Sequence, residues 1–163
     1  MFRGKISLYF ITLILSIFMS FPALSEGFIT GKLKLPFEPK LELKNSKLST
    51  NSKTELLLTF KIDNGAYLYK DMLSFKPDNI SGIKFGAPVY PKPEKKMDKF
   101  SNHEKEIYPK TFIVKIPVEI TDKVKTGKLA FSSTVGFQGC SKTVCFIPQE
   151  KTISTTVEIV KKK

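Results

Sequence analysis

Two cysteines with four residues between them, Cys140 and Cys145, have the clearest capacity for chemistry in this chain. Two thiols this close in an exported protein are expected to form a disulfide. In the chain-entropy estimate, closing a ring of roughly six residues stabilises a fold by only about 2 kcal/mol, against about 4 to 5 kcal/mol for a ring of roughly 100 residues. A disulfide this local stabilises the fold little and can open without disturbing the domain. Its short ring therefore suits thiol:disulfide exchange better than a structural role.

Thiol:disulfide exchange needs a sulfur that can be attacked, a second thiol that resolves the mixed disulfide, and protection of the reduced pair from stray oxidants. Cys140 and Cys145 supply the first two. Their spacing is longer than that of thioredoxin motifs, and no helix N-terminus is predicted beside them to activate a thiolate. Only Lys142 and the positive charge of the chain favour a thiolate. Spacing alone therefore leaves a binding or adaptor module with a structural disulfide open as an alternative.

A Cu(I) site is a third hypothesis, because sulfur ligands favour this ion. Its candidate ligands are Cys140, Cys145, His103 and Met97. Four residues is a long gap for a ligand pair, and there is no second pair of cysteines. The sequence also has no glycine-rich phosphate loop and no paired carboxylates at a spacing typical of acid–base catalysis. We therefore expect no metal, no cofactor and no small-molecule substrate.

The first 25 residues have the features of a secretory signal peptide. Arg3 and Lys5 give a positive start, residues 6–19 are an apolar run, and the Ala-Leu-Ser at 23–25 supplies small residues for cleavage after residue 25. An uncleaved membrane anchor is the alternative, because the apolar run approaches the shortest length that spans a bilayer. We expect residues 26–163 to form one soluble domain in the bacterial periplasm.

The chain carries 27 basic and 15 acidic residues, a net charge of +12, yet Arg3 is its only arginine. Arginine makes the commonest specific contact to guanine and grips phosphates with two donors, so a lysine-only surface argues against a nucleic-acid partner. Export from the cytoplasm also argues against a nucleic-acid partner. We interpret the lysine coat as a solubility effect rather than as a docking surface for acidic partners.

Short runs with period-2 or β-branched patterning recur along the rest of the chain, separated by turn-forming residues, and no stretch shows a sustained helical period. Such a pattern predicts an all-β fold, and at this length an immunoglobulin-like antiparallel β-sandwich in a single domain. Strands are expected at residues 40–43, 54–62, 66–69, 73–76, 82–85, 111–120, 128–137 and 152–160.

The cleanest alternation runs through residues 111–120, where every second residue from Phe112 to Ile120 is apolar and should face the core. Pro117 lies on the opposite face and lacks an amide donor, so this strand is expected beside an edge or a bulge. The longest irregular stretch covers residues 86–105. A structureless segment of that length inside a domain tends to be functional.

Aromatic residues accompany the cysteines. Tyr67 and Tyr69 are two positions apart in a predicted strand and should point to the same side, and Phe137 and Phe146 flank the cysteine segment. Phe100 lies in the irregular stretch. For Phe137 we favour an ordinary place in the core.

The cysteine segment carries a resemblance to a known family. FQGC at residues 137–140 and CFIPQE at 145–150 are similar to the active-site segment of the N-terminal periplasmic domain of the thiol:disulfide interchange protein DsbD. NGAYLY at 64–69 resembles the family's glycine-tyrosine strand, and DKF at 98–100 with EIY at 106–108 resembles its cap-loop region. The resemblance covers the chain from about residue 54 to about residue 156.

This resemblance implies an immunoglobulin-like fold whose two cysteines carry electrons. Cys145 would form mixed disulfides with partners and Cys140 would resolve them, while Phe100 would cap the pair under an apolar lid that a partner displaces. Lys99 departs from the family, which has an acidic residue before the cap phenylalanine, and Ile147 stands where a proline is common. The other side chains expected to line the site are Tyr67, Tyr69, Asp98 and Phe146.

Partners are likewise implied by the resemblance. Electrons would arrive from a membrane electron-transfer protein or its thioredoxin-like domain. They would leave to thioredoxin-like periplasmic proteins, such as disulfide isomerases and the thioredoxins of cytochrome c maturation. Because the family's membrane helices and C-terminal thioredoxin-like domain do not follow in this sequence, we expect a freestanding, monomeric carrier that receives its reductant in trans.

Overall fold

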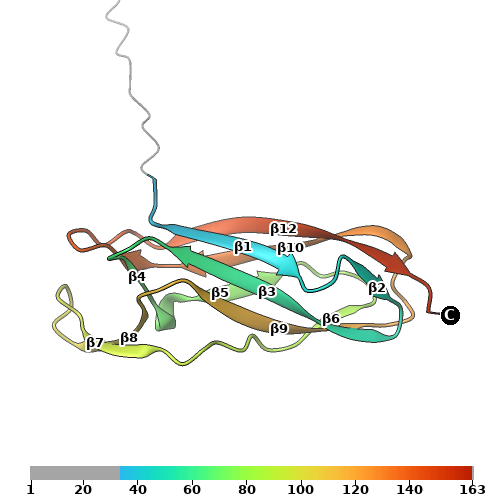
Figure 1. Cartoon of the computed structure of the whole chain (residues 1–163), viewed down its shortest axis with the longest axis horizontal. Coiled ribbons are helices and arrows are strands. Elements are labelled where there is room, and N and C mark those ends of the chain that lie inside the picture. The colour runs from blue at the N-terminus through green and yellow to red at the C-terminus, as the bar shows by residue number, and fades with distance from the viewer. Residues whose placement is uncertain (1–33, 163) are drawn as a thin grey trace, which may run out of the picture. The chain divides into compact units, whose positions relative to one another are not determined.

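The computed structural model describes residues 34–162. The predicted signal peptide, residues 1–25, lies outside this range. Within it the chain forms twelve β-strands and one short 3-10 helix, η1 (Lys70–Met72), and no helix there has the length and apolar character needed to cross a membrane. The all-β class predicted from the sequence is therefore confirmed (Figure 1).

One of the two large sheets has the strand order β1-β3-β9-β6, with every neighbouring pair antiparallel. Its strands are β1 (Phe37–Leu43), β3 (Ser52–Ile62), β9 (Phe112–Ile120) and β6 (Ile83–Phe85). In β9 buried and exposed residues alternate without a break, as the sequence predicts. Pro117 lies in β9 beside the end of the edge strand β6, where its carbonyl oxygen accepts a hydrogen bond of 2.8 Å from the amide of Gly86.

The second large sheet has the order β2-β12-β10-β5. Its strands are β2 (Lys47–Ser49), β12 (Gln149–Val160), β10 (Gly127–Phe137) and β5 (Ser74–Pro77). Here β2 pairs with β12 in parallel, so the sandwich is not wholly antiparallel. In Figure 1, β1 and β2 follow one another in the same direction, because the chain passes from the edge of one sheet to the edge of the other without turning back.

Apolar side chains from both large sheets form one core. Leu58 of β3, Ile116 of β9, Phe131 and Val135 of β10 and Ile159 of β12 are almost completely buried in a single cluster. Burying a side chain of this size stabilises a fold by roughly 1.5 to 3 kcal/mol. Packing of the two sheets on each other thus supplies the scaffold on which the rest of the molecule is built.

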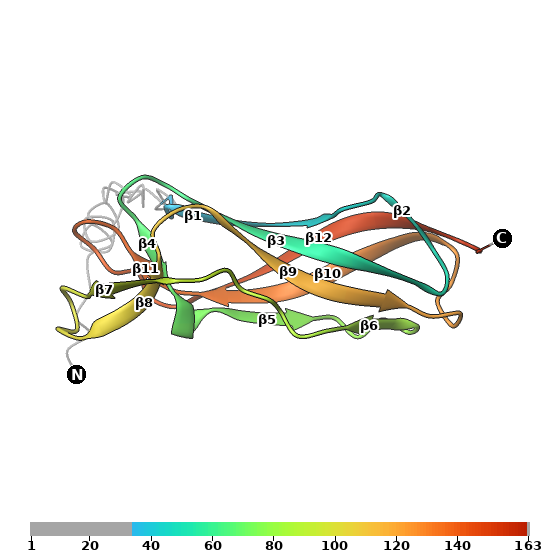
Figure 2. The ribbon, with the colours of Figure 1, turned by 60° about the horizontal axis from the view of Figure 1, so that its bottom comes forward.

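A third, smaller sheet lies at one end of this sandwich, opposite the end that holds β2 and β6 (Figure 2). Its order is β11-β4-β8-β7, all antiparallel. The strands are β11 (Gly139–Cys140), β4 (Tyr67–Tyr69), β8 (Glu104–Tyr108) and β7 (Glu94–Met97). This sheet contains the first cysteine and both tyrosines that the sequence singled out.

The expectation of an irregular stretch over residues 86–105 is wrong for its second half. β7 and the start of β8 form a hairpin there, in which Met97 pairs with Glu104. All four residues of β7 are exposed, and Lys95 contacts Glu104 across the strands at 2.9 Å. Apolar and polar residues alternate along a strand when one of its faces is buried. Because no face of β7 is buried, its sequence shows no such alternation, and the strand could not be predicted from it.

Candidate functional site

Cys140 and Cys145 form a disulfide across a tight hairpin. Their Cα atoms lie 4.0 Å apart, and the two residues face each other as an antiparallel bridge. Backbone hydrogen bonds close the same hairpin, from Ser141 N to the Val144 carbonyl at 2.7 Å and from Phe146 N to the Gly139 carbonyl at 3.0 Å. Backbone hydrogen bonds therefore close the hairpin together with the disulfide.

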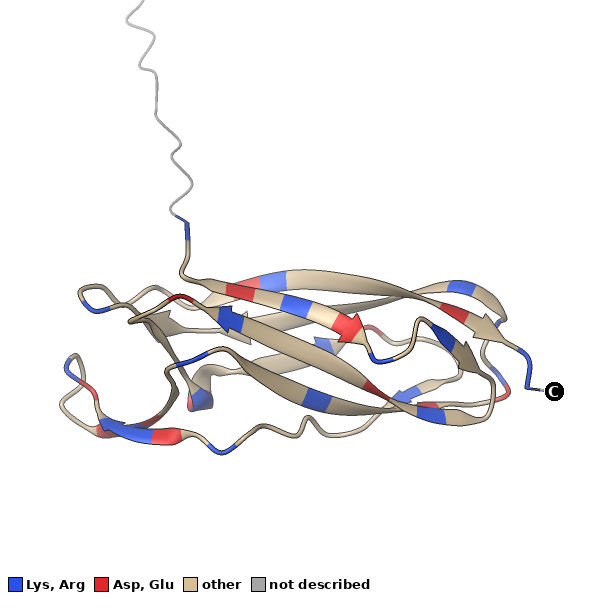
Figure 3. Ribbon diagram, viewed as in Figure 1, with Lys and Arg blue, Asp and Glu red and all other residues tan. Residues whose placement is uncertain are grey.

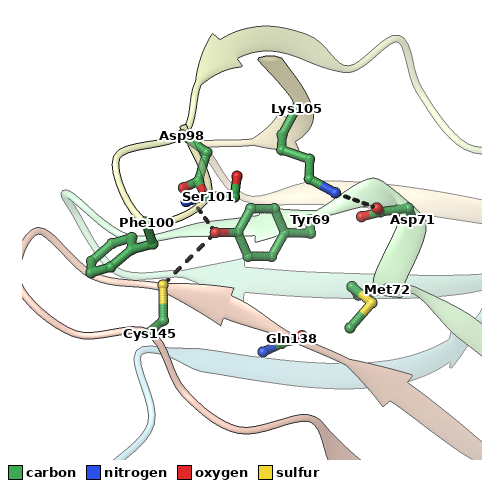
Figure 4. Close-up of a pocket in the computed structure, with 9 residues that line it drawn as sticks. All are labelled: Tyr69, Asp71, Met72, Asp98, Phe100, Ser101, Lys105, Gln138 and Cys145. Atoms are coloured by element: carbon green, nitrogen blue, oxygen red, sulfur yellow. Dashed lines mark hydrogen bonds and ion pairs between the residues drawn. The ribbon is translucent and has the colours of Figure 1, made fainter. Parts of the chain in front are cut away.

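The two sulfur-bearing residues differ in their access to solvent. Cys140 belongs to β11 and is completely buried, whereas Cys145 is half-buried and lines a surface cavity. Figure 4 shows the sulfur of Cys145 directed into this cavity. An incoming thiolate must reach the sulfur that it attacks, so the geometry leaves Cys145 as the accessible end of the bond.

Nine residues line the cavity, and the sequence analysis had singled out only four of them. Gln138 lies within the FQGC segment that carried the family resemblance, so that motif was the signal that could have found it. The others come from the hairpin between β7 and β8 and from η1, whose approach to the disulfide is a feature of the tertiary structure. The lining residues are Tyr69, Asp71, Met72, Asp98, Phe100, Ser101, Lys105, Gln138 and Cys145.

A buried carboxylate lies at the centre of the site. Asp98 is only 2% exposed, and its Oδ1 accepts hydrogen bonds from the hydroxyl groups of Tyr67 and Tyr69, both at 2.9 Å. Its Oδ2 accepts a hydrogen bond from the backbone amide of Ser101, also at 2.9 Å. Burial alone would raise the pKa of Asp98, but the hydrogen bonds from Ser101, Tyr67 and Tyr69 outweigh it and lower this pKa to about 2. Asp98 is therefore an anion at neutral pH.

Tyr69 joins the carboxylate to the disulfide. Its hydroxyl oxygen lies 3.1 Å from Sγ of Cys140 and 3.8 Å from Sγ of Cys145, while it also contacts Asp98. Burial, followed by the hydrogen bond to Asp98, raises the pKa of Tyr69, so the phenol keeps its proton. A phenol has one proton to donate, and a carboxylate is a stronger acceptor than a disulfide sulfur. In the oxidised state the proton of Tyr69 therefore belongs to Asp98.

Phe100 occupies the tip of the β7–β8 hairpin beside the disulfide. The turn is held by hydrogen bonds from Asp98 N to the His103 carbonyl and from Asn102 N to the Asp98 carbonyl, each 2.9 Å. In Figure 4 the ring of Phe100 lies next to Cys145 at the mouth of the cavity, and the residue is 52% exposed. Asp98 thus anchors the turn to the tyrosines, while Phe100 extends from that turn over the accessible sulfur.

The side chain of Phe146 does not line the site, although the sequence analysis expected it there. Its ring packs edge-on against Phe37, with 5.6 Å between the ring centroids, and it joins the main core. Phe137 is buried in the same core, as predicted. What Phe146 contributes to the site is its backbone carbonyl, which accepts a hydrogen bond of 3.0 Å from the side chain of Gln138.

The two candidate copper ligands outside the cysteine segment, Met97 and His103, do not line the cavity that Cys145 lines. Met97 is 64% exposed at the end of β7, and His103 is exposed in the turn that follows. Across residues 34–162 there is no group of three or more histidine, cysteine, aspartate or glutamate side chains placed to hold a metal ion. The part of the chain that the structure describes therefore offers no support for the copper hypothesis.

Comparisons with known proteins agree with this geometry. The family model "Thiol:disulfide interchange protein DsbD, N-terminal" matches residues 35–157, whereas no curated protein matches the chain. The reduced N-terminal domain of Neisseria meningitidis DsbD is 20% identical, with 76% of this chain and 86% of that chain covered and a TM-score of 0.52. A complex of the same domain with the N-terminal domain of PilB gives 20% identity, coverages of 76% and 87%, and a TM-score of 0.50.

At this level of identity the solved structures show a shared fold, while the family model covers most of the chain. The resemblance read from the cysteine segment is thereby confirmed, together with the sandwich architecture. This chain belongs to the family of DsbD N-terminal domains.

Proposed function

We propose that this domain is a thiol:disulfide exchange protein that carries two electrons on the Cys140–Cys145 pair. The observation that carries the proposal is the asymmetry of the bond, in which one sulfur is accessible and the other is buried within a hairpin that its own backbone closes. Such a bond can open and re-form while the sandwich stays folded. Membership of the DsbD N-terminal family supports the same activity.

Electrons enter in two steps. A thiolate of the donor attacks Sγ of Cys145, a bond forms between these two sulfurs, and the Cys140–Cys145 bond breaks with its electron pair on Cys140. The second thiolate of the donor then attacks the donor sulfur of this mixed disulfide and releases Cys145. The donor leaves as a disulfide and the domain as a dithiol, so two electrons have moved. Reduction of an acceptor disulfide follows the same steps in reverse, with Cys140 releasing the acceptor.

Tyr69 is the residue placed to assist the leaving sulfur. When the bond breaks, negative charge appears on Cys140, whose Sγ lies 3.1 Å from the hydroxyl oxygen of Tyr69. Tyr69 can turn its proton from Asp98 to this thiolate, since the carboxylate keeps its hydrogen bonds from Tyr67 and Ser101. Between reactions the fixed charge of Asp98 disfavours a neighbouring thiolate and so holds the reduced pair as less reactive thiols.

Phe100 serves as the cap in this proposal. An apolar ring beside the accessible sulfur hinders small oxidants, and a protein partner displaces it on docking. The turn that bears Phe100 is tied to the site through Asp98, so the same carboxylate positions the cap and tunes the thiols.

The partners we propose are proteins. The related Neisseria domain has been solved in a complex with the N-terminal domain of PilB, which supports a protein rather than a small molecule as the exchange partner here. We propose a membrane electron-transfer protein as donor and thioredoxin-like periplasmic proteins, including those of cytochrome c maturation, as acceptors. Residues 1–25 would export the chain, and residues 26–163 would act as a monomer in the periplasm.

Trapping of mixed disulfides tests this function. A Cys140→Ala variant keeps the accessible sulfur but cannot resolve the mixed disulfide, so it should accumulate covalent complexes with thioredoxin-like proteins from a periplasmic extract. The matched Cys145→Ala variant should accumulate none, because its remaining thiol is buried. A reduction potential below about −300 mV, beyond the reach of thioredoxin-like donors, would contradict the proposal and favour a structural disulfide.

A further inference from the structure

Three lysines, Lys96, Lys99 and Lys142, line one cavity beside the cap residue Phe100. We infer that this lysine rim is a docking surface for a protein partner whose reactive sulfur is flanked by acidic side chains. The inference rests on the proposed exchange function and deepens it, because it names the charge that a partner must bring to the disulfide.

The rim is assembled from segments that are distant in the sequence. Lys96 belongs to β7, Lys99 to the turn that bears Phe100, and Lys142 to the loop between the two cysteines. Figure 3 shows basic residues in the β7–β8 hairpin and in the loop after β11, both at the end of the sandwich that holds the third sheet. The lysine cavity adjoins the cavity that Cys145 lines, because Phe100 lines both.

Two of the three lysines lie against neighbouring parts of the chain. Nζ of Lys96 lies 4.6 Å from the centroid of the Tyr67 ring, a cation–π contact with a residue of the site. The stem of Lys142 lies over Gly65, where a β-carbon would come within 2.7 Å of its Cε. Gly65 has a φ of +81°, which itself favours glycine, so the surface beneath Lys142 is a bare backbone.

The charges of the rim are not neutralised, although those of neighbouring lysines are. Lys70 contacts Glu106 at 2.6 Å, Lys95 contacts Glu104 at 2.9 Å, and Lys105 contacts Asp71 at 3.1 Å. By contrast, none of the ion pairs between residues 34 and 162 involves the three rim lysines. The anion of Asp98 lies beneath the surface and is shared among three donors. A local excess of positive charge therefore remains beside Phe100, in the cavity next to the one that Cys145 lines.

Exposed apolar side chains also occur in the segments around the disulfide, and a mixture of apolar and charged side chains is typical of protein–protein interfaces. Of the seven large hydrophobic side chains exposed in the described part of the chain, five belong to segments around the disulfide. Scattered exposed apolar residues are ordinary, but a group of them beside a reactive sulfur indicates a contact surface. The five are Met72, Met97, Phe100, Val144 and Ile147.

Two disulfide-closed peptides that differ only in charge test the inference. Both have the same disulfide ring, flanked in one by glutamates and in the other by lysines, and the reduced domain is mixed with each. Cys145 attacks the peptide disulfide, and Cys140 then releases the reduced peptide while the domain becomes oxidised. At low ionic strength we expect the acidic peptide to react about tenfold faster, because opposite charges raise the rate of encounter. The advantage should largely disappear at about 0.5 M salt.

A charge-reversed variant sharpens the test. The triple variant Lys96→Glu, Lys99→Glu and Lys142→Glu should invert the preference, so that the basic peptide reacts faster. The control triple Lys123→Glu, Lys125→Glu and Lys161→Glu changes the net charge equally with three exposed lysines outside the third sheet and its loops. It should keep the preference for the acidic peptide. Circular dichroism of both variants verifies that they fold.

The outcomes separate the two proposals. Equal rates with both peptides at low salt, or a preference that the rim variant does not change, would overturn the docking surface and leave the exchange function standing. If the rim variant instead loses binding to phosphatidylglycerol vesicles while peptide rates stay equal, the rim binds membranes and the inference is likewise wrong. If the reduced domain reduces neither peptide nor oxidised thioredoxin, the exchange function fails and the inference falls with it.

Discussion

The two large sheets and the small third sheet use buried positions for different purposes. Between the large sheets the buried side chains are almost entirely apolar, and they form one continuous cluster. In the third sheet a separate cluster contains Tyr67, Tyr69, Ile107 and Cys140, with the carboxylate of Asp98 hydrogen-bonded to both tyrosines. The scaffold thus derives its stability from packing, while the small sheet contains polar groups that are costly to bury and useful for chemistry.

This division has a dynamic consequence. Regions with few buried apolar contacts open locally at a lower free energy than the core does. Leu68 and Tyr108 join the third sheet to the main core, whereas the disulfide lies in the separate small cluster. We therefore expect the disulfide to open and its cap to move without loss of the sandwich. The same bond between the two large sheets would have coupled every exchange reaction to the stability of the whole domain.

The largest expected effect contrasts the two regions directly. Phe131→Ala removes a completely buried ring between the large sheets and should lower the free energy of unfolding by about 3 to 5 kcal/mol. Ile147→Ala truncates a side chain that is 76% exposed, close to the disulfide in the sequence. This substitution should change the free energy of unfolding by less than about 0.5 kcal/mol. Urea denaturation measures both. Similar losses in the two variants would show that the site region is part of the stabilising core.

The second prediction concerns pH and Asp98. Its pKa falls from the usual 3.8 to about 2 in the folded protein, so the folded state favours the anion. This contribution to stability is fully present above about pH 4 and is lost as the pH falls toward 2, and it amounts to roughly 2 kcal/mol. The stability of Asp98→Asn should therefore fall less steeply between pH 5 and pH 2 than that of the parent. Parallel curves would mean that the carboxylate is not held by these hydrogen bonds.

The third prediction compares Tyr67 and Tyr69, to separate an effect on the position of Asp98 from an effect on the reaction at the sulfurs. Both hydroxyl groups bind Asp98, but Tyr69 alone contacts the sulfurs. Tyr69→Phe should slow reduction of the domain by a thioredoxin-like donor by roughly 10- to 150-fold, since loss of one hydrogen bond to a charged group costs about 1.5 to 3 kcal/mol. Tyr67→Phe should change that rate much less. Stopped-flow measurements with equal slowing in both variants would assign the effect to Asp98 instead.

The smallest effect is expected for the cap. Phe100→Ala should speed alkylation of reduced Cys145 by iodoacetamide several-fold, with little change in the free energy of unfolding, because the Phe100 side chain is half exposed. Val144→Ala, which shortens another exposed side chain next to the cysteine, is the control. Equal alkylation rates in Phe100→Ala and the parent would remove Phe100 from its assigned role.

Sequence reasoning succeeded where residues of one kind recur at every second position of a strand. The alternation from Phe112 to Ile120 predicted β9 with its buried face, and the two-residue spacing of Tyr67 and Tyr69 placed both on one side of β4. It failed at β7, whose four residues are all exposed and therefore carry no alternation. It also assigned Phe146 to the site, although the ring packs into the core against Phe37.

By itself, the sequence determined the β-sandwich class, the family and the pairing of Cys140 with Cys145, because strand periodicity and close cysteine spacing are local properties of the chain. Tertiary structure alone decided which sulfur is accessible and that Asp98 is buried against both tyrosines. It also decided that three lysines, which composition alone suggested were part of a general solubility coat, line one cavity beside Phe100. These features join segments up to tens of residues apart, and only the pairing of strands in the third sheet brings such segments together.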